Sequence, residues 1–426
     1  MIHIVNAGET LFSIGEIYGV SPSVLAEING IEEGQSLVVG QAILVLKPLV
    51  SYTVEMGDTL YSISRKFDVP VLQLLRNNPS ITSTFEIFEG SSLVISYEDN
   101  RIRDMIINGY AYPFVDESVL RQSLPYMSFL TIFTYGINED GTLIGIEDER
   151  TIEIARGYRV RPIMLISTLT AEGVFSNALA HEILNDDEKV NTLIESIVLN
   201  IEDKGYGGAD VDFEFVYAED KEKYADFIRR LRERLNPLGY PVIVALAPKY
   251  LDDQVGLIYE GHDYALLGEA ANYALIMAYE WGYTYGPPLA VAPLNEVIRV
   301  LDYGVSRIPR EKIFMGIPNY GYDWTLPYVR GETMAKSISN MEAVDIVRRY
   351  GAKIMFDEKA QSPYFNYTDE EGRGHIVWFE DARSINAKLE TAADYGFAGV
   401  SYWNIMRPFT VNWMTVNDLY NIKRTL

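Results

Sequence analysis

Eight short apolar runs, rich in β-branched residues, recur after residue 104, and amphipathic helical segments separate them. Strands that alternate with helices indicate parallel βα units, because two parallel strands need a crossover connection. The expected strands are residues 105–112, 127–135, 161–167, 208–215, 241–247, 273–279, 313–318 and 398–403. Eight units in about 320 residues favour an α/β fold of the TIM (β/α)8 barrel type over an open, doubly wound sheet.

The first hundred residues contain an internal repeat. Residues 3–14 align with residues 52–63 at a shift of 49 positions, and both copies continue with matching apolar residues. Each copy is predicted to form a strand, two helices and a closing strand. Thr10 and Thr59 precede the apolar periodicity as candidate N-caps, and Pro22 suits the first turn of a second helix. Two copies of one small unit therefore precede the barrel.

These units resemble the LysM module in their Gly-(Asp/Glu)-Thr-Leu motif, in a helix pair that ends near Asn78-Pro79, and in the closing strand that follows a glycine. The resemblance implies two small α+β modules at residues 1–47 and 51–97, followed by the barrel at residues 104–426. It also implies binding of peptidoglycan or other N-acetylglucosamine polymers, by these modules and by the barrel cleft. A stable spacer that binds nothing is the alternative.

Charge and composition exclude several classes of partner. The chain has 36 basic and 60 acidic residues, a formal charge of −24, which phosphate backbones would repel, so no nucleic acid is expected. No apolar run reaches the roughly 20 residues that span a bilayer, so no membrane partner is expected either. The first residues lack the basic and apolar parts of a signal peptide. Cysteine is absent and the four histidines are scattered, so the sequence predicts no metal site and no cofactor.

The segment 207–215 carries a carboxyl group at every second position, at Asp210, Asp212 and Glu214. Side chains alternate along a strand, so in a barrel wall all three would point into the barrel. Crowded carboxyl groups cannot all ionise cheaply, so at least one should have a raised pKa and act as the proton donor that glycosidic-bond cleavage needs. A solvated polar face of an antiparallel strand and a Mg²⁺ or Ca²⁺ site are the alternatives.

This segment is similar to the Asp-x-Asp-x-Glu signature of glycoside hydrolase family 18. Three further segments match in the same order. Residues 277–280 resemble Met-x-Tyr-Asp, residues 316–321 resemble Gly-x-Pro-x-Tyr-Gly, and residues 399–403 resemble an eighth strand that ends in Trp. The resemblance implies a hydrolase that retains anomeric configuration through a substrate-assisted route, in which no second protein carboxylate acts as nucleophile.

The resemblance also implies roles for single residues. Glu214 would be the general acid and then the base, and Asp212 would orient the acetamido group whose oxygen attacks, giving an oxazolinium intermediate. Asp210 would support Asp212, and Tyr279 would hydrogen-bond the acetamido oxygen. The expected substrate-binding residues, of which the first would stack beneath the sugar, are Trp403, Met277, Glu280 and Asn319.

Three features depart from the family pattern. Gly207 stands where the first Asp is usual, which weakens the expected support behind the carboxyl groups. Glu280 is one methylene longer than the usual Asp. Residues 321–397 are expected to hold one helix at 339–350 and the run 353–356, which leaves too little room for a full insertion domain and predicts a shallow, open cleft.

Taken together, the two modules, the barrel and the missing signal peptide resemble the spore-cortex-lytic N-acetylglucosaminidases of endospore-forming bacteria. This implies a peptidoglycan hydrolase that cleaves β-1,4 bonds after N-acetylglucosamine during germination. It also implies a place in the outer layers of the spore, coat or cortex, reached without a classical signal peptide. A chitinase acting on chitin oligomers and a catalytically inactive, chitinase-like glycan-binding protein are the alternatives.

Overall fold

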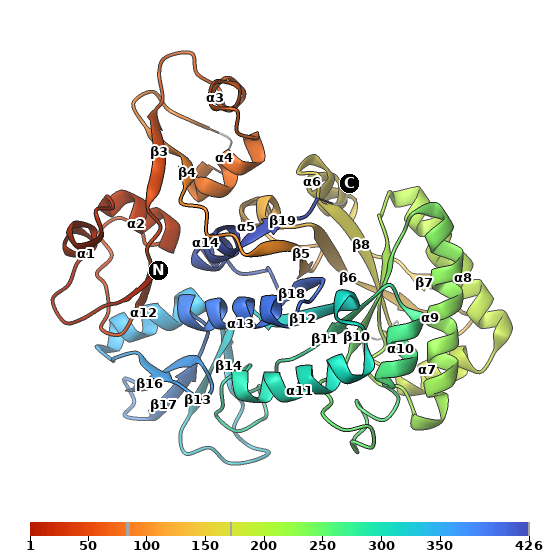
Figure 1. Cartoon of the computed structure of the whole chain (residues 1–426). Coiled ribbons are helices and arrows are strands. Elements are labelled where there is room, and N and C mark those ends of the chain that lie inside the picture. Colours follow the sequence, from red (N-terminus) through yellow and green to blue (C-terminus); the bar gives the residue numbers. More distant parts are fainter. Residues whose placement is uncertain (82–85, 171–172, 425–426) are drawn as a thin grey trace.

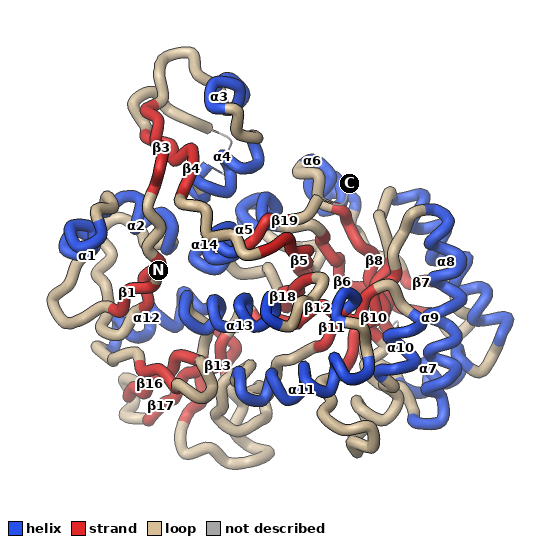
Figure 2. The backbone as a smooth tube through the Cα atoms, in the orientation of Figure 1, coloured by secondary structure: helices blue, strands red, loops and turns tan. Residues whose placement is uncertain are grey.

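The computed structural model describes residues 1–81, 86–170 and 173–424. Two small lobes, formed by the amino-terminal quarter of the chain, lie against one side of a larger barrel (Figure 1). The tube in Figure 2 shows the barrel strands at the centre and helices around them. Within the described residues, no helix has the length and apolar character that crossing a membrane requires.

Each amino-terminal lobe contains the predicted strand, two helices and strand. The first consists of β1 (Ile2–Ile4), α1 (Leu11–Tyr18), α2 (Pro22–Asn29) and β2 (Ala42–Leu44). The second consists of β3 (Pro48–Thr53), α3 (Leu60–Phe67), α4 (Val71–Asn77), a 3-10 turn (Pro79–Ile81) and β4 (Ser92–Tyr97). In both lobes the two strands pair in antiparallel fashion. Thr10 and Thr59 cap α1 and α3 through capping boxes, as predicted.

Eight parallel strands close the barrel, because β5 pairs with both β18 and β6. They are β5 (Arg103–Ala111), β6 (Phe129–Ile137), β8 (Arg161–Ser167), β9 (Ala209–Asp212), β10 (Val242–Leu246), β11 (Tyr273–Ile276), β12 (Ile313–Pro318) and β18 (Gly399–Trp403). Two short strands extend this sheet, β7 (Leu143–Ile144) beside β6 and β19 (Tyr420–Ile422) beside β5. The eight-stranded barrel predicted from the sequence is therefore confirmed.

Helices surround the barrel, and most of them bury one face, whereas α14 is buried on nearly all sides between the barrel and the amino-terminal lobes. They are α5 (Glu117–Ser123), α6 (Glu149–Gly157), α7 (Asn177–Leu184), α8 (Asp187–Lys204), α9 (Lys221–Leu235), α10 (Tyr264–Ala270), α11 (Leu294–Arg307), α13 (Ala382–Asp394) and α14 (Thr410–Leu419). Helix α8 illustrates the rule, since six apolar residues spaced along one face are buried, namely Val190, Leu193, Ile194, Ile197, Val198 and Ile201. Short 3-10 turns lie at Leu124–Tyr126, Ala218–Asp220, Asn236–Leu238 and Arg310–Lys312.

The expectation that no insertion domain fits between the last two barrel strands was wrong. A five-stranded antiparallel sheet occupies this interval. Its elements are β13 (Gly321–Thr325), β14 (Lys336–Ile338), α12 (Asn340–Tyr350), β15 (Met355–Asp357), β16 (Ser362–Thr368) and β17 (Gly374–Trp378). Strands as short as three residues complete the sheet, and it has a core of its own that includes Val347, Phe365 and Val377. The cleft therefore has a wall where an open edge was expected.

Both amino-terminal lobes are docked. Helix α2 packs against α14, and α4 packs against α14 and the turn Leu124–Tyr126. In the first lobe, Ile354 N donates to Val39 O over 3.0 Å, and Arg348 Nε donates to Ser36 O over 3.0 Å. The two lobes also touch each other, since Ser80 Oγ donates to Glu27 Oε1 over 2.5 Å. Barrel and lobes thus share one continuous apolar core.

Candidate active site

Three carboxyl groups occupy the carboxyl end of β9. Asp210 and Asp212 lie on the same side of this strand, and Glu214 follows two residues after the strand ends. Asp210 and Asp212 are buried, whereas Glu214 is partly exposed. The predicted cluster therefore lies where barrel enzymes carry their catalytic groups, and its outermost member is accessible to solvent.

Asp210, the innermost carboxyl group, is held by a tyrosine from the first barrel strand. The hydroxyl of Tyr110 donates to Asp210 Oδ2 over 2.5 Å. Burial raises the pKa of Asp210 to about 7, although hydrogen bonds from Tyr110 and Thr131 act in the opposite direction. Thr131 also lies 3.0 Å from Asn108, which donates to Ser401 over 2.9 Å, so a polar network crosses the barrel interior behind the carboxyl groups.

The pKa values of the two outer carboxyl groups are also raised. Burial raises the pKa of Asp212, and the negative charges of Glu214 and Asp210 raise it further. Burial and the charge of Glu280 raise the pKa of Glu214. Because these groups titrate together, the cluster holds protons near neutrality that isolated carboxyl groups would have lost. The Oδ1 atoms of Asp210 and Asp212 are buried and have no hydrogen-bond partner among the described residues.

Tyr279 follows β11 and lies against Gly316 on the neighbouring strand β12. A Cβ added at Gly316 would lie 2.7 Å from Tyr279 Cε1 and 2.8 Å from Ile276 O, so only glycine leaves room for the ring. Burial and the charges of Asp212 and Glu214 raise the pKa of Tyr279. Its phenol therefore stays protonated and can donate a hydrogen bond beside the carboxyl groups.

Glu280, the longer replacement for the family's Asp, is held by two tyrosines. Tyr320 donates to Glu280 Oε1, and Tyr322 donates to the same oxygen over 3.2 Å. Glu280 adopts a φ of 71°, a left-handed conformation that a residue other than glycine rarely takes. Tyr322 lies on β13, so the insertion domain supplies part of this support. The two hydrogen bonds thus hold the carboxylate of the longer Glu280 side chain in one position.

Trp403 ends β18 and is partly exposed in the cleft. Its ring lies 5.2 Å from that of Phe133 and 5.6 Å from that of Tyr110, measured between centroids, with both pairs edge to face. Met277 is half-buried in the same apolar cluster. Among the described residues, no aromatic ring stacks on Trp403, whose ring neighbours contact it edge to face or at a tilt.

Asn319, which is expected to bind substrate, lies beside the loop that follows Trp403. It is buried, and its Nδ2 donates to the backbone oxygens of Asn404 over 2.9 Å and Arg407 over 3.1 Å. Its Oδ1 has no hydrogen-bond partner among the described residues. The structure thus gives Asn319 the task of holding the loop after Trp403.

The space beside Gly207, where the family usually has an Asp side chain, is occupied by the side chain of Arg161. A Cβ at this position would overlap the side-chain stem of Arg161. Support behind the carboxyl groups comes instead from Tyr110, which sequence reasoning missed. Burial and the charge of Glu214 raise the pKa of Tyr112, so a second missed tyrosine lies near the outermost carboxyl group. The sequence contained a signal for these tyrosines, because Tyr110 and Tyr112 lie two positions apart at the end of the first predicted strand and so share one of its faces.

The sequence profile of glycosyl hydrolases family 18 matches residues 128–407. The chain belongs to this family. The LysM profile matches residues 3–45 and 52–96, so both amino-terminal lobes are LysM domains, as the repeat predicted. The protein is a glycoside hydrolase with a TIM barrel. Among the described residues, no group of three or more His, Cys, Asp or Glu side chains is arranged to hold a metal ion.

Curated relatives of this family 18 chain match it along its whole length. The cortical fragment-lytic enzyme of Bacillus subtilis is 36% identical, covering 99% of this chain and 98% of its own. The enzyme of the same name from Bacillus anthracis is 36% identical over 100% of both chains. The crystal structure of the Bacillus cereus spore cortex-lytic enzyme SleL has a TM-score of 0.84 and 35% identity, and the match covers 100% of this chain and 98% of that one.

Proposed function

We propose that this family 18 hydrolase is an N-acetylglucosaminidase that cleaves the β-1,4 bond after N-acetylglucosamine in spore-cortex peptidoglycan during germination. The observation that carries this proposal is the row of three carboxyl groups at the end of β9, of which Glu214 is accessible to solvent and has a raised pKa. The names of the relatives support the choice of cortex peptidoglycan as substrate, since they are cortical fragment-lytic and spore cortex-lytic enzymes.

Glu214 acts first as general acid in this mechanism. It donates its proton to the glycosidic oxygen while the bond from that oxygen to the anomeric carbon breaks. The carbonyl oxygen of the substrate's own acetamido group bonds to the anomeric carbon from the other face, which gives an oxazolinium ion. Glu214, now a carboxylate, then takes a proton from the water that opens this ion. Configuration at the anomeric carbon is retained.

Asp212 and Tyr279 orient the acetamido group. The free, buried Oδ1 of Asp212 is available to accept a hydrogen bond from the amide N–H, and the nearby negative charge stabilises the oxazolinium ion. Tyr279 donates to the acetamido oxygen. Asp210 and its bond from Tyr110 keep Asp212 in place from behind.

Trp403 binds the sugar by stacking on its apolar face, a role supported by the partly exposed ring at the end of β18. Met277 borders the same surface, and Glu280 reaches the sugar from its two tyrosine supports. Asn319 contributes by fixing the loop after Trp403, with its free Oδ1 as the remaining contact for a ligand.

The two LysM domains hold the enzyme on its polymer. We assign them to residues 1–47 and 51–97 and the catalytic barrel to residues 104–426. Linked weak sites raise apparent affinity without new contacts, which suits an enzyme that acts on an insoluble glycan. By analogy with the cortex-lytic relatives, the protein acts in the outer layers of the spore.

The decisive experiment compares two substrates. Purified protein is incubated with cortex fragments and, separately, with chitin oligomers, and new reducing ends are identified by mass spectrometry. Reducing-end N-acetylglucosamine from cortex supports the proposal. Cleavage of chitin oligomers alone would replace it with a chitinase, and binding without cleavage of either would leave an inactive glycan-binding protein.

A further inference from the structure

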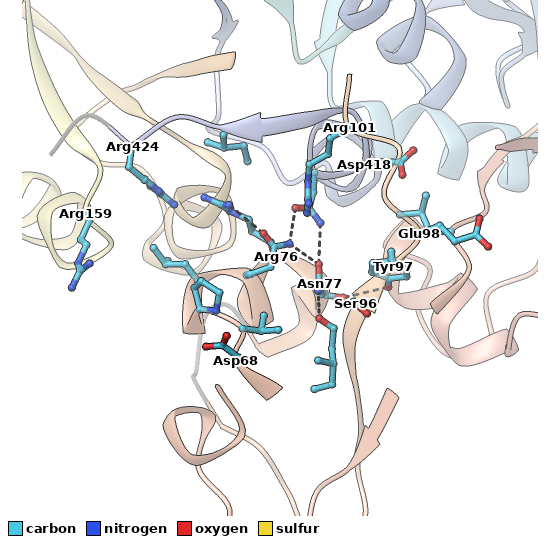
Figure 3. Close-up of a pocket in the computed structure, with 18 residues that line it drawn as sticks. Asp68, Arg76, Asn77, Ser96, Tyr97, Glu98, Arg101, Arg159, Asp418 and Arg424 are labelled. Atoms are coloured by element: carbon cyan, nitrogen blue, oxygen red, sulfur yellow. Dashed lines mark hydrogen bonds between the residues drawn. The ribbon is translucent and has the colours of Figure 1, made fainter. Parts of the chain in front are cut away.

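A cavity of about 580 Å³ separates the second LysM domain from the barrel (Figure 3). Its walls come from α4 and β4, from the linker that follows β4, and from the carboxyl-terminal segment around β19. Strand β19 pairs with the beginning of β5, and Arg159 precedes β8, so the cavity borders the amino ends of the barrel strands. It is therefore separate from the catalytic cleft at their carboxyl ends.

Four guanidinium groups and three carboxyl groups, those of Asp68, Glu98 and Asp418, line this cavity, so cations outnumber anions there although the chain as a whole is strongly acidic. The guanidinium groups belong to Arg76, Arg101, Arg159 and Arg424. Arg76 Nε and Arg424 Nη2 both donate to the same acceptor, the carbonyl oxygen of Pro125, over 2.7 Å each. Among the described residues, neither side chain forms an ion pair with a carboxylate. Two cations thus converge on one neutral oxygen.

This arrangement is costly without an anion. Burial and the charge of Arg424 together lower the pKa of Arg76 to about 9. Burial and the charge of Arg159 lower the pKa of Arg424 to about 10. The Nε of Arg424 is buried and has no hydrogen-bond partner among the described residues. Buried charges are ordinarily paired, and arginine forks bind carboxylate and phosphate groups particularly well.

The wall beside the arginines is fixed by amide groups from both domains. Gln73 Nε2 donates to Asn77 Oδ1 over 2.9 Å and to Asn417 Oδ1 over 3.1 Å, and Asn417 Nδ2 donates to Asn77 Oδ1 over 3.2 Å. Gln73 and Asn77 lie on α4, whereas Asn417 lies on α14. The cavity is thus preformed, and its volume falls in the range of small-molecule sites.

We propose that this cavity is a second ligand site, which binds an oxyanion group on a sugar- or peptide-sized ligand between the second LysM domain and the barrel. In peptidoglycan such groups are the free carboxylates of the stem peptide, because the lactyl carboxyl group of muramic acid is joined to that stem by an amide bond. The assignment to peptidoglycan rests on the proposed function, whereas the binding of an anion does not. The cavity would then recognise carboxylates of a bound polymer at a distance from the glycosidic bond that the active site cleaves.

Calorimetry on the full chain tests this proposal with three probes: N-acetylmuramoyl-L-alanine, a muramic sugar whose free carboxylate lies on the attached alanine; N-acetylglucosamine, which lacks a carboxylate; and inorganic phosphate. We expect the muramic sugar to bind at least about tenfold more tightly than the neutral sugar. Arg76→Gln and Arg424→Gln should each abolish most of this roughly tenfold preference for the muramic sugar over the neutral sugar. Arg229→Gln, a matched change at an exposed arginine paired with Asp226 and Glu233, should leave it intact.

Equal affinity for the two sugars, or a preference that survives both cavity variants, would overturn the proposal. Binding of phosphate without binding of the muramic sugar would overturn the assignment to peptidoglycan, even if cortex cleavage is intact. Should the Arg76 variant fail to fold, Arg101→Gln on the cavity rim gives the same comparison. Hydrolysis of soluble fragments should be unchanged in every cavity variant, which separates this site from the catalytic one.

Discussion

The hydroxyl of Tyr110 lies 2.5 Å from Oδ2 of Asp210, and it joins the first barrel strand to the fourth. The bond satisfies one oxygen of the innermost carboxyl group. It also takes over the support that the family's first Asp would give, since Gly207 has no side chain to offer it. Burial raises the pKa of Asp212, and the charges of Glu214 and of Asp210, whose position is thus fixed, raise it further.

Replacing Glu214 by Gln should abolish hydrolysis and leave binding nearly unchanged. The amide has the same shape but no proton to donate, and general acid catalysis typically contributes about 10²- to 10⁴-fold to the rate. Initial rates of reducing-end release and calorimetry with cortex fragments measure the two effects. Glu219→Gln, at an exposed position in the same loop region, is the control. Full activity of Glu214→Gln would contradict the mechanism.

Tyr110→Phe should shift the pH dependence of the reaction. The Tyr110 hydrogen bond lowers the pKa of Asp210, so its loss should move the ionisation of the carboxyl cluster to higher pH. We expect a fall in rate of about tenfold at neutral pH, with KM changed little, because one hydrogen bond to a charged group is worth about 1.5 kcal/mol or more. The pH profile of kcat checks this. An exposed control, Tyr61→Phe, should keep the native profile.

Stability should fall as the pH rises from about 4 to above 7. Burial raises the pKa of Asp210 to about 7 in the folded protein, against about 3.9 in an unfolded chain. Folding therefore favours the protonated form, and its contribution is full below pH 4 and lost as the pH passes 7. The difference amounts to about 2 to 4 kcal/mol. Asp210→Asn should show a flatter dependence of Tm on pH, and an unchanged slope would contradict this.

Gly316→Ala should disturb Tyr279 and reduce activity. The added methyl group would lie 2.7 Å from the Tyr279 ring, so ring or backbone must move, at a cost of about 1 to 3 kcal/mol. Thermal unfolding and initial rates measure the two consequences. Gly145→Ala is a matched control, because a Cβ there meets nothing within 4 Å. Equal Tm values and initial rates for the two variants would show that Tyr279 does not depend on the absence of a side chain at Gly316.

Gly40→Ala should release the first LysM domain from the insertion domain. A Cβ at Gly40 would overlap the carbonyl oxygen of Ile354, which belongs to the docking contact. Gly34→Ala provides the control, because Gly34 has a similar positive φ, 82° against 86°, but an added Cβ meets nothing within 4 Å. Limited proteolysis between the LysM domains and the barrel should accelerate in the first variant only. Identical cleavage rates would argue against docking at this contact.

The features that sequence determined are those that repeat along the chain. The strands of the barrel, the two LysM units with their threonine caps, and the alternating carboxyl groups after residue 209 all follow from local periodicity. Such patterns arise because a strand or helix must bury one face whatever it packs against. They were sufficient to predict the barrel and the alternation of Asp210, Asp212 and Glu214, whereas the family was predicted from the resemblance of four motifs to known ones.

Only the tertiary structure decided what those residues touch. The Tyr110 bond, the support of Glu280 by Tyr322, the docking of both LysM domains and the shared acceptor of Arg76 and Arg424 each join segments far apart in the chain. Two of the five strands of the insertion domain, β14 and β15, have three residues each, which is too short to show a periodicity. Its strand β13 pairs with β17, which is distant in the sequence, and local pattern does not reveal that pairing. Contacts of this kind depend on how distant surfaces meet, and no local pattern in the sequence records that.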